Sequence, residues 1–212
     1  MMQIPDPVHG YIELDGMFAD IVNTPEFQRL RSVEQGSFRP VYPGARHDRF
    51  AHSLGTYHLA TQFVEHFFEN LKKDTGVVLS AGERQALSLT FRYAALLHDI
   101  GKVPTFTRDE TGRGHFLGHA QVGSEIADGI LLRLKAPTAL RHQVVFLISH
   151  HMTPIEPDKR LLLRRLSRYG TEQLLTLLNL QEADMGSKGT GKEEEMAQFD
   201  VLRAIIAELL AE

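Results

Sequence analysis

Apolar residues recur every three or four positions along most of this chain, which predicts a protein built from α-helices. Only a short stretch near the N-terminus, residues 11–14, has the character of an extended segment. We find no internal repeat and no further strand pattern. The expected fold is therefore all-α, a single helical bundle with at most a small N-terminal hairpin. The helices are expected at about residues 24–35, 49–73, 81–98, 117–136, 138–151, 161–169, 172–185 and 193–210.

The most apolar of these helices ends on a histidine and an aspartate. Residues 87–97 are apolar on nearly every face, so this helix should lie at the centre of the bundle. Gly101 and Pro104 then signal its end. His98 and Asp99 would thus be held at the end of a rigid core helix, where they could bind a metal together. Alone, the same pair would more often be a polar helix end than a metal site.

The chain is expected to form one domain over residues 1–185, followed by a glycine-rich linker at 186–192 and an amphipathic helix at 193–212. The final helix could fold back on the domain or pair with another subunit, which leaves a homo-oligomer open. The loop at 101–116 lies next to the His-Asp pair. A loop of this length beside two potential ligands is more typical of an active-site rim than of a simple connection.

The amino-acid composition limits the types of metal ligand and the binding partners that this chain can have. The chain has no cysteine and 11 histidines, which excludes disulfides and thiolate metal sites and points to nitrogen and oxygen ligands. The net charge is −4 without a dense basic stripe, so we expect no duplex nucleic-acid partner. There is no run of 18 apolar residues and no signal peptide, so we expect no membrane span and a cytoplasmic location.

Further histidines and one aspartate stand where the predicted helices begin or end, or along their core faces. His52 alone would be an ordinary surface histidine, and Asp184 alone could be a helix cap or a paired carboxylate. As a set they supply imidazole and carboxylate ligands that suit Mn, Fe, Ni, Co, Zn or Mg. The full set comprises His52, His98, Asp99, His119, His150, His151 and Asp184.

The order His52, His98-Asp99, Asp184 resembles the H…HD…D signature of the HD-domain superfamily of metal-dependent phosphohydrolases, and the resemblance covers roughly residues 4–186. Residues 5–60 are similar to deoxynucleoside-triphosphate triphosphohydrolases through Asp6-Pro7-Val8-His9-Gly10, Thr24-Pro25-Glu26-Phe27-Gln28-Arg29-Leu30 and the stretch His47 to Gly55. Residues 98–185 are more similar to the HD domains of bacterial CCA-adding tRNA nucleotidyltransferases through His98-Asp99-Ile100-Gly101-Lys102, the stretch Gly114 to His119 and His150-His151-Met152.

The resemblance implies that a divalent metal is bound by His52, His98, Asp99 and Asp184. It also implies a phosphate contact from Arg49, a nucleotide contact from Gln35 and a catalytic role for His119. By likeness to two-metal HD phosphodiesterases, His119, His150 and His151 could hold a second ion, although the Gly-Tyr-Pro motif of the cyclic-dinucleotide branch is absent.

Three positions depart from the triphosphohydrolase pattern. Lys102 replaces a histidine, Ala120 replaces a glutamate after the catalytic histidine, and Met185 and the glycine-rich linker stand where substrate-binding residues are expected. Triphosphohydrolase activity, monophosphate hydrolysis and cyclic phosphodiester hydrolysis therefore all stay open.

The expected function is metal-dependent hydrolysis, by a phosphatase or a phosphodiesterase, of nucleotides or related phosphoesters. A metal-activated water would attack phosphorus. Lys102 and Arg49 would neutralise the phosphoryl oxygens, and His119 would protonate the leaving oxygen or hold a second metal. One alternative is a non-catalytic, metal-containing nucleotide-binding or regulatory module. Another is a purely structural helical domain.

Overall fold

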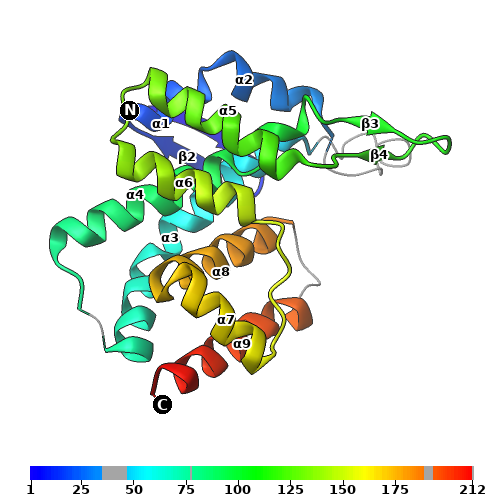
Figure 1. Cartoon of the computed structure of the whole chain (residues 1–212). Helices are drawn as coiled ribbons and strands as arrows, with labels where there is room; N and C mark the ends of the chain where they lie inside the picture. The colour runs from blue at the N-terminus through cyan, green and yellow to red at the C-terminus, as the bar shows by residue number, and fades with distance from the viewer. Residues whose placement is uncertain (35–46, 77, 189–192, 212) are drawn as a thin grey trace.

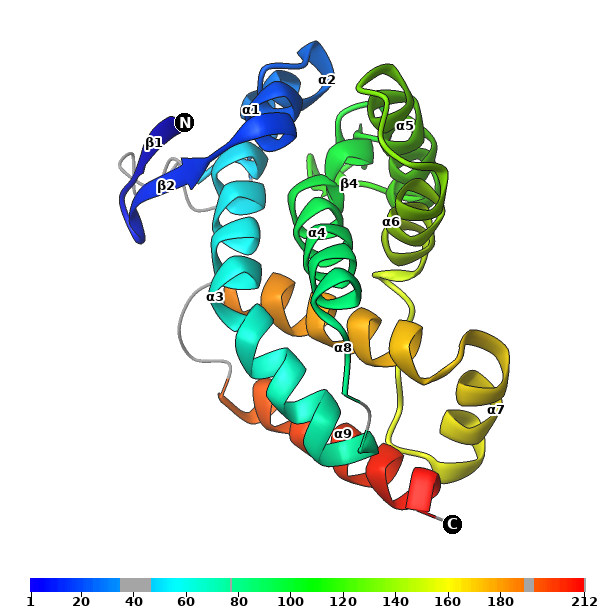
Figure 2. The same cartoon turned by 90° about the vertical axis from the view of Figure 1, so that its left-hand side faces the viewer.

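Two long helices, α3 (Arg49–Thr75) and α4 (Ala81–Leu97), pack side by side at the centre of the protein (Figures 1 and 2). The structure is a computed structural model, and it describes residues 1–34, 47–76, 78–188 and 193–211. Asp48 caps α3 by accepting a hydrogen bond from the Ala51 amide, and Ser80 and Glu83 form a capping box at the start of α4. These caps fix where both central helices begin.

The other helices surround this pair. Helices α5 (His119–Arg133) and α6 (Thr138–His150) pack against each other, and α6 also packs on α4. Helix α8 (Thr171–Gly186) crosses α3, α4 and α6, and α7 (Lys159–Tyr169) packs on α8. The last helix, α9 (Glu193–Ala211), folds back on α3, α7 and α8 and buries Phe199, Leu202 and Ile206. Within the described residues, no helix is both long enough and apolar enough to cross a membrane.

The predicted N-terminal hairpin is confirmed. Strands β1 (Met2–Asp6) and β2 (Gly10–Leu14) pair antiparallel, with Ile4 opposite Ile12. A short helix that we did not predict, α1 (Gly16–Val22), follows and buries Phe18, Ile21 and Val22. Its seven residues give too short a periodic pattern to distinguish from a loop.

The helix predicted over residues 24–35 is shorter than expected. Thr24 caps α2 (Pro25–Gln28), and a 3-10 turn, η1 (Arg29–Ser32), follows. The backbone then becomes extended at Val33, whose carbonyl accepts a hydrogen bond of 2.8 Å from the Arg49 amide. This pairing with the start of α3 replaces the helical hydrogen bonds. Gln35, the expected nucleotide contact, lies outside the described residues.

The predicted loop at 101–116 contains more structure than expected. It opens with a 3-10 turn, η2 (Ile100–Lys102), and carries a second small hairpin of β3 (Thr107–Arg108) and β4 (Gly114–His115). Asp109 holds the hairpin turn by accepting hydrogen bonds from the amides of Thr111 and Arg113. Our expectation of no strand beyond the N-terminal hairpin is therefore wrong here. Two-residue strands leave no alternation that a sequence pattern could reveal.

Candidate metal centre

The His-Asp pair lies in the interior of the bundle, where α4 ends. His98 is the C-terminal cap of α4 and Asp99 begins the η2 turn, and both side chains are 0–1% exposed. The turn packs closely on the first turns of α5. A Cβ atom at Gly101 would come within 2.1 Å of the His119 carbonyl oxygen, so glycine is required at this position. This contact places His119 beside the pair.

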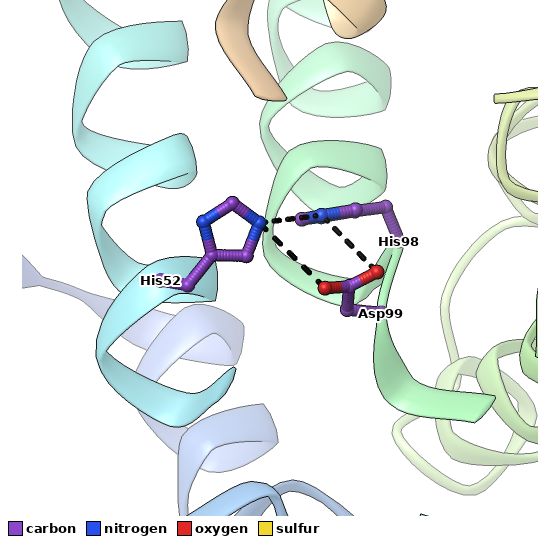
Figure 3. Close-up of side chains that lie close together, drawn as sticks. All are labelled: His52, His98 and Asp99. Atoms are coloured by element: carbon purple, nitrogen blue, oxygen red, sulfur yellow. Dashed lines mark hydrogen bonds and ion pairs between the residues drawn. The ribbon is translucent and has the colours of Figure 1, made fainter. Parts of the chain in front are cut away.

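The first group of potential ligands joins α3 to the end of α4. Figure 3 shows the His52 ring reaching from α3 toward His98 and Asp99. The Nε2 atoms of the two histidines are 3.3 Å apart, and those of His52 and His98 lie 3.6 and 3.5 Å from the nearer Asp99 oxygens. Asp184, in the last turn of α8, adds Oδ1 at 2.9 Å from His52 Nε2 and 3.4 Å from His98 Nε2.

A second group lies on the other side of Asp99. His119, the first residue of α5, and His151, the C-terminal cap of α6, place their Nε2 atoms 3.3 Å apart. These atoms are 3.8 and 4.0 Å from Asp99 Oδ1. In each group the potential ligand atoms lie within 4.8 Å of one another, and Asp99 belongs to both. Asp99 is thus shared by the two groups of potential ligands.

The two carboxylates are oriented in the same way. Asp99 Oδ2 accepts hydrogen bonds from Lys102 at 2.7 Å and Arg49 at 3.1 Å, and Asp184 Oδ2 accepts one of 2.7 Å from Lys188. Asp184 Oδ1 faces His52 and His98. Asp99 Oδ1 faces His98, His119 and His151, whereas His52 lies nearer to Asp99 Oδ2. Asp99 Oδ1 is buried and accepts no hydrogen bond from any described residue. A buried carboxylate oxygen in this condition is costly, and a cation between it and the imidazoles would satisfy it.

The histidine rings are oriented to bind a cation. The Nδ1 atoms of His98, His119 and His151 lie 2.6–2.8 Å from backbone carbonyls, which can only accept, so each Nδ1 carries a proton. A neutral ring in this state presents a lone pair at Nε2. Lone pairs of His119 and His151 facing one another at 3.3 Å repel unless a proton or cation lies between them. The donor set thus fits a divalent metal.

The titration behaviour of these groups reflects their burial and charge. Burial lowers the pKa of His52 and His151 to about 4, although nearby carboxylates oppose the shift. For His98, burial acts in the same direction, but the Asp99 and Asp184 carboxylates outweigh it and raise the pKa. Burial alone would raise the pKa of Asp99, yet His98, Lys102 and Arg49 together hold it well below its usual value. Asp99 is therefore a carboxylate at any physiological pH.

The structure brings most of the expected site residues together. His52, His98, Asp99, His119, His151 and Asp184 converge, and Arg49 and Lys102 contact Asp99. The reading of His52 as a surface histidine is wrong, because its side chain is fully buried.

His150 does not join either group. Its Nδ1 lies 2.8 Å from the Phe146 carbonyl, and its ring stacks on the Phe146 ring with centroids 4.4 Å apart. As consecutive residues at a helix end, His150 and His151 point in different directions, and the pair alone could not tell which one faces the site.

Two further residues of the site were assigned by the sequence to a flexible linker. Ser187 places Oγ 3.0 Å from His52 Nδ1, and Lys188 holds Asp184 Oδ2. They follow Asp184 by three and four residues, which puts all three on one face of the last helical turn. That spacing was readable, but Gly186 and the glycines beyond it suggested a linker.

Comparison with known proteins places the region that carries these residues in a known family. The family model for the HD domain matches residues 49–185. The A-adding tRNA nucleotidyltransferase of Deinococcus radiodurans is 30% identical over 207 residues, which are 97% of this chain and 41% of that protein. The deoxynucleoside triphosphate triphosphohydrolase SAMHD1 of Homo sapiens is 42% identical over 105 residues, 49% of this chain and 16% of that protein.

A third relative, the uncharacterized protein YwfO of Bacillus subtilis, is 33% identical over 181 residues, 77% of this chain and 39% of that protein. The chain spans less than half the length of each of these relatives. Both the HD match and the triphosphohydrolase similarity agree with the resemblance drawn from the motifs.

Proposed function

This chain belongs to the HD domain family, and we propose that it is a metal-dependent phosphohydrolase acting on nucleotides or related phosphoesters. The observation that carries the proposal is the orientation of Asp99. Its Oδ2 atom is held by two cationic side chains, while its buried Oδ1 atom faces histidines of both groups. This arrangement leaves one oxygen for metal and sets positive charge beside the place where a phosphoryl group would bind.

The ligand set supports one or two divalent cations. His52, His98, Asp99 and Asp184 would hold the first, and Asp99, His119 and His151 would hold the second. Mn, Fe, Ni, Co, Zn and Mg all suit nitrogen and oxygen donors. When bound, such a cation supplies Lewis acidity toward a phosphoryl oxygen and lowers the pKa of a coordinated water.

Lys102 and Arg49 are the groups that would stabilise negative charge on the substrate. Both donate to Asp99 Oδ2, at 2.7 and 3.1 Å, so their charges are fixed within a few ångströms of the cation positions. The Phe116 ring lies close to both, with its centroid 5.7 Å from Lys102 Nζ and 5.9 Å from Arg49 Cζ. Preorganised cations of this kind act most strongly on the charge that develops in a phosphoryl-transfer transition state.

His119 had two expected roles, as proton donor and as metal ligand. Burial lowers its pKa, and the nearby Lys102 charge adds to the effect, so the ring is neutral near pH 7. A neutral ring whose Nδ1 proton is directed to the Phe116 carbonyl presents a lone pair at Nε2. These properties favour the role of ligand over that of proton donor.

The class of substrate comes from the names of the relatives. One is a deoxynucleoside triphosphate triphosphohydrolase and another is an A-adding tRNA nucleotidyltransferase. Their shared chemistry is the nucleotide phosphate, so we propose a nucleotide or a nucleotide-like phosphoester. Because the triphosphohydrolase match covers only about half of this chain, the substrate within that class is to be found by experiment.

The test is a hydrolysis screen of the purified protein. Nucleoside mono- and triphosphates, deoxynucleotides, 2′,3′-cyclic nucleotides and an aryl phosphate would each be incubated with Mn, Ni, Co or Mg. We expect turnover that requires the metal and disappears in Asp99→Ala, while a surface variant such as Asp128→Asn retains it. Wild-type protein that binds none of these metals would refute the proposal.

A second candidate is a binding module that keeps the metal without turnover. Ala120 favours it, because the triphosphohydrolases that the N-terminal region resembles carry a glutamate there. The same screen separates the two: metal in the wild-type protein together with no hydrolysis of any substrate would favour the module.

A further inference from the structure

We propose that Phe106 and Phe116, at the base of the β3–β4 hairpin, form an aromatic surface on which the nucleobase of the substrate stacks. The inference rests on the proposed function and deepens it, because it names the groups that would distinguish nucleotides from other phosphoesters. The loop at 101–116, which carries both residues, was expected to form the rim of an active site. Figure 1 shows its hairpin projecting from the helical bundle.

The hairpin brings the two rings into contact. Strands β3 and β4 pair Thr107 with His115, and Phe106 and Phe116 are the next residues along each strand, at the base of the hairpin. Their ring centroids lie 5.4 Å apart, with an angle of 34° between the planes. This separation is typical of aromatic side chains that pack on each other. The two rings therefore form one surface.

This aromatic surface is held in place but is not covered. A Cβ atom at Gly114 would lie only 2.7 Å from Phe106 Cε2, so the Phe106 ring packs directly on the backbone of β4. Nevertheless, Phe106 is 42% exposed, and Leu117, which follows the half-buried Phe116, is 84% exposed. A group of exposed apolar side chains beside a polar site is typical of a surface that binds a ligand.

Phe116 connects the aromatic surface to the candidate metal centre. Its carbonyl oxygen lies 2.8 Å from His119 Nδ1. Its ring centroid lies 5.7 Å from Lys102 Nζ and 5.9 Å from Arg49 Cζ, the two charges proposed to neutralise the phosphoryl group. Both distances are at the outer limit of a cation–π contact, so this attraction gives only a weak reason for the position of the ring. An aromatic ring a few ångströms from phosphate-binding charges lies where the sugar and base of a nucleotide would extend.

A nucleobase fits this surface better than an aliphatic group does. Every base has a flat π face, and stacking on an aromatic side chain stabilises its binding with little dependence on which base it is. An aliphatic phosphoester offers the same phosphate to Lys102 and Arg49 but has no face to stack. The aromatic surface therefore predicts a preference for phosphoesters that carry a base, without a strong choice among bases.

The first test compares Phe106→Leu with Phe63→Leu. Phe63 is a matched control, because it is also a phenylalanine, is 40% exposed and lies on α3, outside the hairpin. Hydrolysis of the best nucleotide from the screen and of glycerol phosphate, an aliphatic phosphoester, would be measured for the wild type and both variants. We expect Phe106→Leu to lower kcat/KM for the nucleotide by roughly 5- to 150-fold, mainly through KM, and to change that for glycerol phosphate by less than about twofold. Phe116→Leu should act in the same direction, and Phe63→Leu should match the wild type with both substrates.

The second test measures stacking without turnover. The chain contains no tryptophan, so Phe106→Trp introduces a single indole into the aromatic surface. A base that stacks on an indole quenches its fluorescence. Titration with adenosine monophosphate, with and without Mg²⁺, should give saturable quenching in Phe106→Trp. Glycerol phosphate should give none, and Phe63→Trp should respond to neither compound.

Equal losses with the nucleotide and with glycerol phosphate in Phe106→Leu would make the ring pair a structural support of the hairpin and would overturn the proposal. The same conclusion would follow if adenosine monophosphate did not quench Phe106→Trp, or quenched Phe63→Trp equally. A wild-type protein that hydrolyses no phosphoester would count against the proposed function instead. In that case the fluorescence titration still decides whether a base stacks on the hairpin, because it requires no hydrolysis.

Discussion

Lys102 donates a 2.7 Å hydrogen bond to Asp99 Oδ2, and the opposite oxygen of Asp99 faces His98 of the first ligand group and His119 and His151 of the second. The Lys102 side chain is only 9% exposed, so water screens its charge little. Burial lowers its pKa although Asp99 opposes this effect. A lysine in this position resists binding of another cation and assists binding of a phosphate.

We therefore expect Lys102→Gln to separate metal binding from turnover. Removing a positive charge beside Asp99 should leave Mn²⁺ affinity equal to or greater than that of the wild type. Loss of a fixed charge from the transition state should lower kcat by roughly 100- to 1,000-fold. Calorimetry and steady-state hydrolysis of the best substrate would measure the two quantities. Lys72→Gln, an exposed lysine on α3, is the control. A parallel loss of metal and activity in Lys102→Gln would instead make Lys102 a structural support of Asp99.

The sharing of Asp99 predicts a difference between the two carboxylates. Asp99→Asn should weaken both proposed cation sites, because Asp99 belongs to both groups of potential ligands. Asp184→Asn should weaken only the first, since Asp184 contacts His52 and His98 alone among the histidines of the site. Metal content after dialysis against Mn²⁺, measured by mass spectrometry, would test this. Asp128→Asn, at a surface ion pair with Arg141, should match the wild type. Equal losses in Asp99→Asn and Asp184→Asn would argue for a single cation.

Adjacent histidines at the end of α6 should behave oppositely. His151→Gln removes a potential ligand of the second group and should abolish the weaker of two Mn²⁺ binding events. His150→Gln should leave binding intact, because His150 packs between Phe146 and Tyr169. It should instead cost about 1 kcal/mol of stability through lost ring contacts. Calorimetric titration and thermal denaturation of both variants would check this. Loss of metal in His150→Gln would mean that the side chain moves into the site.

The sequence predicted the scaffold of the site better than its fine structure. The long apolar periods of α3 and α4 predicted both central helices to within a few residues. Asp99 and its neighbours were found because ligand-type residues stood at helix ends in a recognisable order. Short elements such as α1 and β3–β4 escaped because they depend on contacts that no local pattern encodes.

The sequence also could not predict the directions in which the side chains of the site point. His52 lies away from the stripe of apolar residues on α3, and its side chain is buried against His98 at the end of α4 and Asp184 of α8, which lies far along the chain. The sequence analysis missed Ser187 and Lys188 for a related reason: they contact the site only because Asp184, one turn earlier, is part of it. Helical spacing could have placed them, whereas the choice between His150 and His151 needed the three-dimensional structure.

The buried histidines predict that the metal-free protein loses stability in mild acid. Burial lowers the pKa of His52 and His151 from 6.5 to about 4. Between these pH values the unfolded chain therefore binds protons that the folded chain does not bind. The contribution of each ring to the free energy of unfolding is complete above pH 6.5. It falls as the pH drops toward 4, by on the order of 3 kcal/mol for each ring. Burial also lowers the pKa of His119, which adds to the loss below 6.5. The raised pKa of His98 changes stability above 6.5, and the lowered pKa values of Asp99 and Asp184 change it below 3.8.

Urea denaturation of chelator-treated protein across that pH interval would measure the loss. The double variant His52→Gln/His151→Gln should show a clearly smaller dependence on pH, because it removes the two rings whose pKa burial lowers to about 4. His66→Gln, at an exposed histidine of α3, should keep the wild-type dependence. If the double variant and the wild type lost stability equally between 6.5 and 4, the acid sensitivity would have to come from groups other than His52 and His151. Saturating Mn²⁺ should extend the stable range to lower pH, since metal and protons compete for the same Nε2 lone pairs.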